Sequence, residues 1–400
     1  MCGQYYPKAG YGDVRNIVTC PLTGIHPHEL IETSSITRKA VEMFTGKKEY
    51  LNLPRKFKIG ISSCKINCIK PELNDLALVA IKSEYGIGFI PLVGGGLGPP
   101  PFLAQPLNIF VPLSEALEFI RTVVEVYRDH GPRDRKSNAR FKWLIKEKGL
   151  SRVRELIEEK MGKSFQYLDC SKLNLEWREH DIVSHEKENG LYSLVVPTFT
   201  GLLNVHQFKK IIEIAERYGD EIRVSPAQKL VLIHVPEEEL SRVKEELKMI
   251  GLDLGQPLIK IRTKACPSDF CGKSLESSKK RASMLLDYLV DKFGKDLEKL
   301  DIGISISGCP NSCAQHLISD IGLQSTLIKK DGISTPCFNL YIMGKGSKLS
   351  KLFIKNIPED RVNLVIEDIL KKFINSGLRD FHQFADKLLE GDLDYEYRGM

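Results

Sequence analysis

Four cysteines in the last third of the sequence form two close pairs whose spacing suits a metal centre. Four residues separate Cys266 from Cys271 in ACPSDFC, and three separate Cys309 from Cys313 in GCPNSC. Four thiolates on two loops can hold a tetrahedral zinc ion or a cubane iron–sulfur cluster. Zinc ribbons and knuckles prefer two residues between paired cysteines, so the spacing favours the cluster. Gly and Pro residues beside each pair indicate loops, which argues against four buried free thiols.

A second group of residues with useful chemistry is basic. Lys56 and Lys58 stand on either side of Phe57 in LPRKFK. If this segment is a strand, both ammonium groups project from one face and can meet a common anion. The same pattern is equally typical of a solvated basic edge strand. The residues alone leave both interpretations open.

These positions lie in two related halves of the sequence. ISSCKINCIKPELND around Cys64 matches ISGCPNSCAQHLISD around Cys309 at an offset of 245, and residues 111–134 match residues 357–380 at an offset of 246. Similar apolar patterns explain shared Ile and Val positions, but not the shared Cys, Pro, Gly and Arg-Asp positions. We therefore expect an internal duplication that produces two related modules.

Each module is predicted to contain the same elements in the same order. Hydrophobic periodicity predicts an amphipathic helix, a short apolar strand, a Cys-bearing turn, a strand pair and a closing helix. The helices are expected over residues 36–44 and 282–293, and the strands over 59–61 and 302–306. Cys64 and Cys68 repeat the spacing of the second module's cysteine turn, with Cys20 as their only upstream companion. We interpret them as a remnant of the duplication in preference to a second metal site.

A segment of different character, residues 190–252, lies between the modules. Its pattern predicts a β-α-β-β-α order, which is half of a ferredoxin-like unit. The strands are expected over 191–199, 221–225 and 229–235, and the helices over 205–218 and 237–250. The middle strands carry no aromatic residues, which disfavours RNA binding. Residues 136–189 are predicted to be a helical linker, and the charges between residues 133 and 163 its solvated face.

The composition is typical of a globular chain of two or three domains, with 400 residues, 42% hydrophobic and 28% charged. No apolar run approaches the roughly eighteen residues of a membrane span, and residues 1–15 lack the pattern of a secretory signal. We expect a cytoplasmic protein without membrane association. The net charge of +6 is mild and evenly spread, so it disfavours nucleic acid as a partner and tolerates an anionic ligand.

The motifs together resemble the sulfite and nitrite reductase hemoproteins, which carry siroheme coupled to a 4Fe-4S cluster. The resemblance rests on the paired cysteines, GCPNSC, GDVRNIVTCPLTGI, LPRKFKIGIS and the duplication, and it extends from about Gly12 to the C-terminus. It implies a cluster held by Cys266, Cys271, Cys309 and Cys313, with the Cys313 sulfur shared between the cluster and the siroheme iron.

The resemblance also implies roles for other side chains. Arg15 in GDVRN, Lys56 and Lys58 match the anion-binding residues of the family, and Asn311 matches a residue that contacts the macrocycle. Because nitrite reductases of the family tend to carry Asn at the position of Lys58, the sequence favours sulfite. A further basic trio precedes the first cluster loop and either neutralises siroheme carboxylates or lies on a solvated strand: Lys260, Arg262 and Lys264.

The expected fold class is α+β, with two duplicated mixed α/β modules and one ferredoxin-like half between them. The expected domains are a siroheme- and anion-binding repeat over 1–135, a helical linker over 136–189, the ferredoxin-like half over 190–252, and an iron–sulfur and siroheme-binding repeat over 253–400.

The expected function is the six-electron reduction of sulfite to sulfide. The sequence shows no flavin motif, no dinucleotide fingerprint and no run of ferredoxin-type cysteines, so the electrons are expected from a separate donor such as a ferredoxin or a flavoprotein. The alternatives are reduction of nitrite to ammonia, the related oxygenase chemistry of cobalamin synthesis, and a non-catalytic or partner-dependent siroheme iron–sulfur subunit.

Two departures from the family pattern carry expectations of their own. The family usually places five residues between its first two cluster cysteines, whereas four separate Cys266 from Cys271, so we expect this loop to close more tightly. Family members also have another ferredoxin-like half, with a further anion-binding arginine, before the GDVRN region. We therefore expect residues 190–252 to leave an apolar face or edge for another subunit, and the chain to be a fragment, a short form or one component. Without the second half, we expect weak siroheme retention and low activity.

Overall fold

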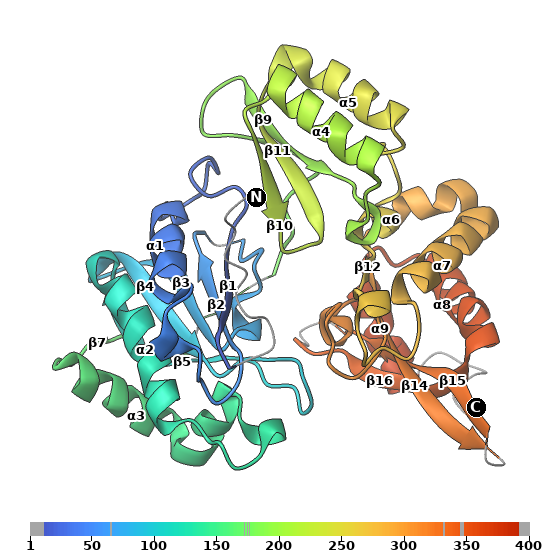
Figure 1. Ribbon diagram of the computed structural model, residues 1–400. Helices are drawn as coiled ribbons and strands as arrows, with labels where there is room; N and C mark the ends of the chain where they lie inside the picture. The colour runs from blue at the N-terminus through green and yellow to red at the C-terminus, as the bar shows by residue number, and fades with distance from the viewer. Residues whose placement is uncertain are drawn as a thin grey trace.

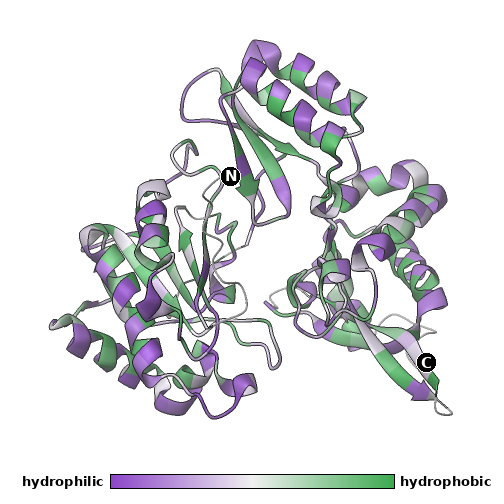
Figure 2. Ribbon diagram, viewed as in Figure 1, coloured by the Kyte–Doolittle hydropathy of each residue, from purple (hydrophilic) through white to green (hydrophobic). Residues whose placement is uncertain are grey.

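The computed structural model describes residues 12–64, 66–171, 173, 175, 177–330, 333–344 and 348–391. Its strands form three sheets, each covered by its own helices (Figure 1). In Figure 1 the first module is blue to green, the segment between the modules yellow-green, and the second module orange to red. Figure 2 shows that many helices have mixed hydrophilic and hydrophobic faces, as expected for helices that cover a sheet.

The first module is built on a seven-stranded sheet of order β1-β2-β3-β4-β6-β7, with β5 paired to β4. Its strands are β1 (Val14–Thr19), β2 (Phe57–Ser62), β3 (Leu76–Ser83), β4 (Gly86–Val93), β5 (Gln105–Pro106), β6 (Ile109–Pro112) and β7 (Gln166–Tyr167). Its helices are α1 (Ser34–Phe44), α2 (Ala116–His130) and α3 (Phe141–Met161). The first three strands are parallel, so they place the loops that follow β1 and β2 at one edge of the sheet.

Helix α3 lies in the segment that the sequence predicts to be a linker. Phe141, Leu144, Val153 and Ile157 are fully buried in the core of the first module. The interpretation of the charges in this segment as a solvated face is wrong for Lys142, which is 3% exposed. Because Phe141 of the first turn of α3 packs into the core of the module, the neighbouring Lys142 is buried as well. We propose domain boundaries after residues 135, 189 and 252, with α3 of the second segment packed onto the first module.

The second module repeats the topology of the first. Its sheet has the order β12-β13-β14-β15-β16, again with three parallel strands followed by antiparallel pairs. Its strands are β12 (Lys264–Ala265), β13 (Ile304–Ser307), β14 (Ile321–Lys330), β15 (Ile333–Ile342) and β16 (Lys351–Pro358). Its helices are α6 (Leu258–Arg262), α7 (Ser278–Phe293), α8 (Val362–Asn375) and α9 (Phe381–Glu390). The matching order and directions of the strands confirm the duplication.

The backbone repeats even at unusual conformations. Asn67 and Lys70 have φ of 52° in the turn after β2, and Ser312 and Gln315 have φ of 54° and 66° in the turn after β13. Non-glycine residues rarely adopt positive φ. Two such residues at the same offset of 245 show that the cysteine turns of the two modules share one backbone path.

The segment between the modules folds as the sequence predicts. It contains β9 (Leu191–Val196), α4 (Val205–Tyr218), β10 (Glu221–Ser225), β11 (Lys229–Pro236) and α5 (Leu240–Met249). The strand β8 (Val183–His185) extends its sheet, which has the order β10-β11-β9-β8. Helices α4 and α5 share one apolar core with this sheet. The predicted α+β class, with two duplicated mixed modules and a ferredoxin-like half between them, is confirmed.

The opposite face of this small sheet is partly covered by the first module. Val231 and Ile233 of β11 are almost fully buried and pack with Cys20, Leu22 and Ile25 from the loop after β1. The expectation of an exposed apolar face is therefore wrong for this part of the sheet, because the same chain supplies the covering loop. Among the helices of the described residues, none combines the length and hydropathy required to cross a bilayer.

The two modules also contact each other directly. Leu73 and Leu97 from the first module form an apolar cluster with Ile318 and Met343 from the second. At the rim of this cluster, the Lys348 ammonium lies 2.7 Å from a carboxylate oxygen of the buried Glu72. The turns that carry the predicted functional residues therefore face each other across a packed junction.

Candidate functional site

A cavity of about 320 Å³ at the junction of the modules brings together residues that are far apart in the sequence. Lys56 and Lys58 come from the beginning of the second strand of the first module, while Asn311 and Cys313 come from the cysteine turn of the second module. The first pair lies at the beginning of β2 and the second pair follows the end of β13, so opposite ends of two strands related by the duplication meet at this cavity. Four residues that the sequence predicts to be functional therefore line one cavity.

The lining of this cavity is strongly cationic. It includes seven basic side chains: Arg55, Lys56, Lys58, Lys136, Arg140, Lys142 and Lys273. Among the described residues that line it, none carries a carboxylate. A concave site with one sign of charge raises the local concentration of ligands of the opposite sign. The cavity is therefore suited to a small anion and to a cofactor that carries carboxylates.

The two predicted lysines owe their position to the alternation of β2. Phe57 between them is fully buried in the core, so Lys56 and Lys58 project to the other side. The backbone amide of Lys58 donates to a carboxylate oxygen of Asp75 over 2.8 Å, which fixes the beginning of the strand. Lys58 reaches solvent through the cavity although protein atoms surround it on most sides.

The electrostatics of these lysines follow from their crowding. Burial lowers the pKa of Lys56, and the charges of Lys58 and Arg140 lower it further. Burial also lowers the pKa of Lys58, with Arg140 as the next cause. In Lys142 the same two causes lower the pKa to about 8. An ammonium group of lowered pKa gives up its proton more readily at neutral pH, and an added anion relieves the repulsion between such groups.

Arg15 lies near the cavity and outside its lining. Val14 of β1 pairs with Phe57 of β2, so Arg15 and Lys58 are each the next residue after this pair on neighbouring strands. The guanidinium of Arg15 pairs with the carboxylate of Asp13, and its charge contributes to lowering the pKa of Lys58. The anion-binding role of Arg15 stays a prediction.

Sequence reasoning missed the ion pair between Arg140 and Asp75. The guanidinium makes two hydrogen bonds of 3.0 and 2.6 Å to this fully buried carboxylate. Burial opposes the charge of Arg140, but the carboxylate outweighs it and raises the pKa of Arg140. The signal that was available is Asp75 itself, because the duplication matches it to Asp320, which pairs with His382 over 2.6 Å. A repeated acidic residue indicates a repeated basic partner.

The loops that carry the four predicted cluster cysteines are joined by backbone hydrogen bonds. The amide of Leu275 donates to the carbonyl of Gly308 over 2.9 Å, and the amide of Gly308 donates to the Cys266 sulfur over 3.3 Å. A side chain at Gly308 would collide with Ser274, because an added Cβ would lie 1.8 Å from the Ser274 hydroxyl. The glycine therefore allows the second loop to approach the first.

The positions of the four cysteine sulfurs bear on the two metal centres that the sequence leaves open. No three of the sulfurs of Cys266, Cys271, Cys309 and Cys313 lie within 4.8 Å of one another. Zinc–sulfur bonds of about 2.3 Å in a tetrahedron place the ligand sulfurs about 3.8 Å apart. A cubane places each thiolate on a different iron and spreads the sulfurs more widely. The sulfurs of these four cysteines are therefore not gathered at the spacing of a single zinc ion, whereas a four-iron cluster does not require that spacing.

Cys313 connects the cysteine loops with the cationic cavity. Burial raises the pKa of the Cys313 thiol, and the neighbouring charge of Lys56 acts in the opposite direction. The thiolates of Cys309 and Cys266 are close enough to affect it as well. A group bound to Cys313 would therefore lie between the cysteine loops and the two lysines.

Two residues of the basic trio before the first cluster loop have other partners. Lys264 pairs with Glu179, and Arg262 pairs with Asp301. Both basic side chains line a second cavity of about 470 Å³, which is separate from the one at Cys313. These ion pairs favour a structural role for Arg262 and Lys264 over direct contact with a ligand at Cys313.

Comparison with known proteins agrees with this geometry. The chain matches the family described as "Nitrite and sulphite reductase 4Fe-4S domain" over residues 10–165, and the "Nitrite/Sulfite reductase ferredoxin-like half domain" over residues 185–250. The first match covers the first module and α3. The second covers the small sheet between the modules.

The similar proteins include both sulfite and nitrite reductases. Sulfite reductase (ferredoxin) 2 of Mycolicibacterium paratuberculosis is 31% identical over 393 residues, which are 95% of this chain and 70% of that protein. Ferredoxin–nitrite reductase of Synechococcus elongatus is 30% identical, covering 84% of this chain and 67% of that protein. The structure of the Mycobacterium tuberculosis NirA protein superimposes with a TM-score of 0.88 and 28% identity, covering 96% of this chain and 72% of that one. The fold, the duplicated modules and these relatives together show that the chain belongs to the nitrite and sulfite reductase family.

Proposed function

We propose that the protein is a siroheme-dependent reductase that converts sulfite to sulfide with electrons from a separate donor. The observation that carries this proposal is the cavity in which Lys56, Lys58, Asn311 and Cys313 meet. Reduction of hydrogen sulfite to hydrosulfide consumes six electrons and six protons and releases three waters. The site must therefore bind a compact anion beside an electron source and deliver protons to it.

Siroheme and a 4Fe-4S cluster are the cofactors of the family, and together they supply electrons to the bound anion. We assign the cluster to Cys266, Cys271, Cys309 and Cys313. The sulfurs are not gathered at the spacing of a zinc site, and the hydrogen-bonded loops around Cys266 bring the two cysteine pairs together, which supports this assignment. Cys313 and Asn311 both reach the cavity, which supports contact between this turn and the siroheme.

The protein's own residues supply anion binding and protons. Lys56 and Lys58 hold and orient the anion, and Arg15 contributes positive charge from the neighbouring strand. The Nζ atoms of the two lysines are positioned proton donors, because the pKa of each is lowered by burial. Arg140, fixed by Asp75, is a cation that does not change its charge during the reaction.

Sulfite is the proposed substrate because Lys58 occupies a position where nitrite reductases of the family tend to carry Asn. The names of the relatives include reductases of both anions. Nitrite is the second candidate, since the cationic cavity does not by its charge distinguish the two anions. Its reduction to ammonia, released as ammonium, consumes six electrons and eight protons and releases two waters.

The proposed electron donor is a ferredoxin, which the names of several relatives contain. We further propose a cytoplasmic location, because a reducing compartment keeps the cluster thiolates available. The small sheet has an edge at β10, where Val224 is 77% exposed, and we propose this edge as the place where another subunit or copy pairs.

The test is the visible absorption spectrum of protein purified anaerobically from cells with an ample supply of siroheme, with iron and acid-labile sulfide measured on the same sample. We expect isobacteriochlorin bands, about five iron atoms and about four sulfides per chain. Sulfite added with reductant should perturb the spectrum and then be turned over. Zinc in place of iron at Cys266, Cys271, Cys309 and Cys313, or a cluster without siroheme, would contradict the assignment of the cavity.

Competition between the two anions identifies the substrate. Initial rates are measured with sulfite and nitrite, alone and together, using reduced ferredoxin. We expect a higher kcat/KM for sulfite. A higher kcat/KM for nitrite would favour the second candidate. Spectral perturbation by both anions without turnover in cofactor-replete protein would favour a non-catalytic subunit.

A further inference from the structure

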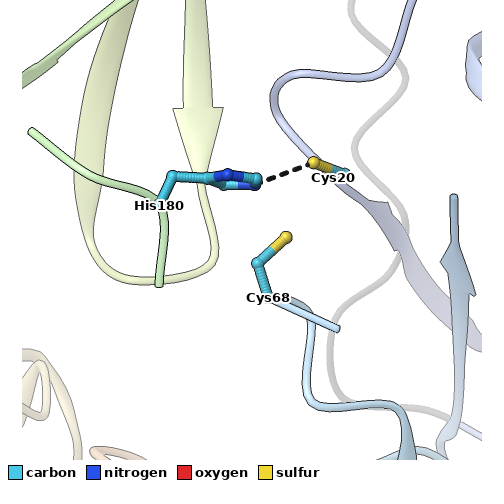
Figure 3. Close-up of side chains that lie close together, drawn as sticks. All are labelled: Cys20, Cys68 and His180. Carbon is cyan, nitrogen blue, oxygen red and sulfur yellow. Dashed lines mark hydrogen bonds between the residues drawn. The ribbon is translucent and has the colours of Figure 1, made fainter. Parts of the chain in front are cut away.

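A second group of metal-ligand side chains lies on the first module, away from the four cluster cysteines. The Cys20 sulfur is 3.1 Å from the Nε2 atom of His180, and one ligand atom each from Cys20, Cys68 and His180 lie within 4.8 Å of one another. Figure 3 shows the three side chains converging from separate segments of the chain. Two thiols and an imidazole in one small volume are a typical ligand set for zinc.

The duplication relates the two cysteines of this group to two of the predicted cluster ligands. Cys20 directly follows β1, and Cys266 directly follows β12 at an offset of 246. Cys68 matches Cys313 at an offset of 245, in the turn with the repeated positive-φ residues. The backbone pairing agrees, because Thr19 pairs with Ile61 as Ala265 pairs with Ile306. The first module thus presents two thiols from the backbone positions that present thiols in the second.

The third member of the group comes from outside the duplicated segments. His180 belongs to the segment between β7 and β8, and the amide of Arg178 in the same segment donates to the carbonyl of Ile66 over 3.1 Å. This hydrogen bond fixes the segment against the turn that carries Cys68. His180 therefore reaches the two thiols because the segment crosses over the first module.

The group is accessible from outside. Cys68 and His180 line a cavity of about 310 Å³, whose polar walls include Glu179, Asp181 and Lys229. Cys20 is 2% exposed and forms the inner side of the group. An ion can therefore enter from the cavity and meet its innermost ligand last, and one coordination position would face the cavity.

We propose that Cys20, Cys68 and His180 bind a single zinc ion, separate from the iron–sulfur cluster of the second module. The three ligand atoms already lie within 4.8 Å of one another, which is compact enough for a tetrahedral zinc site whose ligand sulfurs lie about 3.8 Å apart. The four cysteines of the second module do not meet this condition. Soft sulfur ligands with an imidazole select zinc over magnesium or calcium, which prefer oxygen ligands.

The zinc ion would tie together three parts of the chain. Cys20 also packs with Val231 and Ile233 from the small sheet, at the face that the first module covers. A bond from zinc to Cys20, Cys68 and His180 fixes the loop after β1, the cysteine turn and the segment that leads into the small sheet. The zinc would thus hold the ferredoxin-like half against the first module, with water as its fourth ligand on the side of the cavity.

The test uses the chain loaded with siroheme and cluster, because its cluster cysteines are then occupied. The protein is incubated with a small excess of Zn²⁺ and desalted, and zinc and iron are measured by elemental analysis. We expect about one zinc per chain, with the iron content unchanged. Cys68→Ser and His180→Ala should each weaken zinc binding by roughly 100-fold or more, since each removes a direct ligand. Both variants should keep the siroheme and cluster absorption.

Cys170→Ser is the matched control, because Cys170 is a buried thiol of the same connecting segment that packs in a different apolar cluster. It should retain one zinc per chain. His180 is only half-buried, so His180→Ala keeps the test valid if a cysteine variant fails to fold. Zinc far below one per chain in the parent protein, or unchanged zinc in His180→Ala, would overturn the proposal. Additional iron and acid-labile sulfide that are lost in Cys68→Ser would also overturn it, in favour of a second cluster.

Discussion

At the scale of single residues, the chemistry of the cavity depends on cations held close together. Lys56 and Lys58 lie beside each other, Arg140 adds a fixed charge, and Lys142 donates to the carbonyl of Gly98 over 2.7 Å. The positive charges repel one another in this partly buried site until an anion enters. Relief of this repulsion therefore favours anion binding, and the lowered pKa values of the lysines favour proton delivery.

Lys58→Asn tests the choice of substrate. A hydrogen bond to a charged partner is worth about 1.5–3 kcal/mol, so we expect kcat/KM for sulfite to fall roughly 10- to 100-fold. Nitrite should lose less, because it carries less charge than sulfite. Steady-state kinetics with both anions measures the change in preference. Lys82→Asn, at an exposed position of β3, is the matched control and should leave both values unchanged. An equal loss for both anions would argue against a role of Lys58 in selectivity.

The pH dependence of anion binding follows from the lowered pKa of Lys142, about 8. This lysine is charged below that pH and neutral above it, so the cavity loses a cation as the pH rises from 7 to 9. Lys56 and Lys58 change in the same direction. We expect KM for nitrite, which stays a monoanion over this range, to rise about three- to tenfold. The effect should be reduced in Lys142→Arg, whose charge persists. A KM that stays constant from pH 7 to 9 would contradict this account.

At the scale of elements, close approach of backbone segments positions the site. The glycine run after β4 passes beside the turn that precedes β3, and an added Cβ at Gly95 would lie 2.2 Å from the carbonyl oxygen of Glu72. At Gly98 an added Cβ would meet no atom within 4 Å. The run therefore serves two purposes: Gly95 allows the backbone to pack, while Gly98 lines the cavity.

Gly95→Ala is expected to destabilise the first module by about 1–3 kcal/mol, because the clash is with backbone atoms that cannot rotate away. Urea unfolding followed by circular dichroism measures the effect. Gly98→Ala is the control from the same run, and we expect its free energy of unfolding to stay within about 0.5 kcal/mol of the parent value. Equal stability of Gly95→Ala and Gly98→Ala would show that the backbone moves to accommodate the methyl group.

At the scale of the whole molecule, the duplication explains where the sites are. Each cysteine turn faces the opposite module, so the junction contains two cavities that correspond by the internal repeat. One contains Cys313 with Lys56 and Lys58, and the other contains Lys70 with Lys264. The second cavity contains the ion pair of Lys264 with Glu179, whereas the lining of the first includes no carboxylate among the described residues. The two copies of one ancestral site have therefore diverged in their charges.

Glu72 tests how firmly the modules are joined. Its carboxylate accepts from the indole of Trp177 over 2.6 Å and from Lys348 of the second module over 2.7 Å. Glu72→Gln removes the charge and places a donor among donors, so we expect a loss of about 1–3 kcal/mol and faster release of siroheme. Siroheme remaining after gel filtration measures the release. Glu84→Gln, in the exposed turn after β3, should match the parent protein. Full siroheme retention by Glu72→Gln would show that the apolar contacts alone hold the junction.

The sequence by itself determined the local features of this protein. The duplication, the β-α-β-β-α order and the helix over residues 205–218 depend on spacing and periodicity, which are local properties of the chain. The cysteine pairs and the alternation of Lys56 with Phe57 and Lys58 were visible for the same reason. In each case the residues that define the pattern are close together in the sequence.

Only the tertiary structure decided which distant groups meet. Arg140 was interpreted as part of a solvated face, yet it pairs with Asp75, which lies 65 residues away and has a fully buried carboxylate. Cys20, Cys68 and His180 were not recognised as one site, because the histidine is 160 residues from the first cysteine. Contacts of this kind depend on the packing of complete elements against each other. They therefore cannot be inferred from the spacing of residues along the chain.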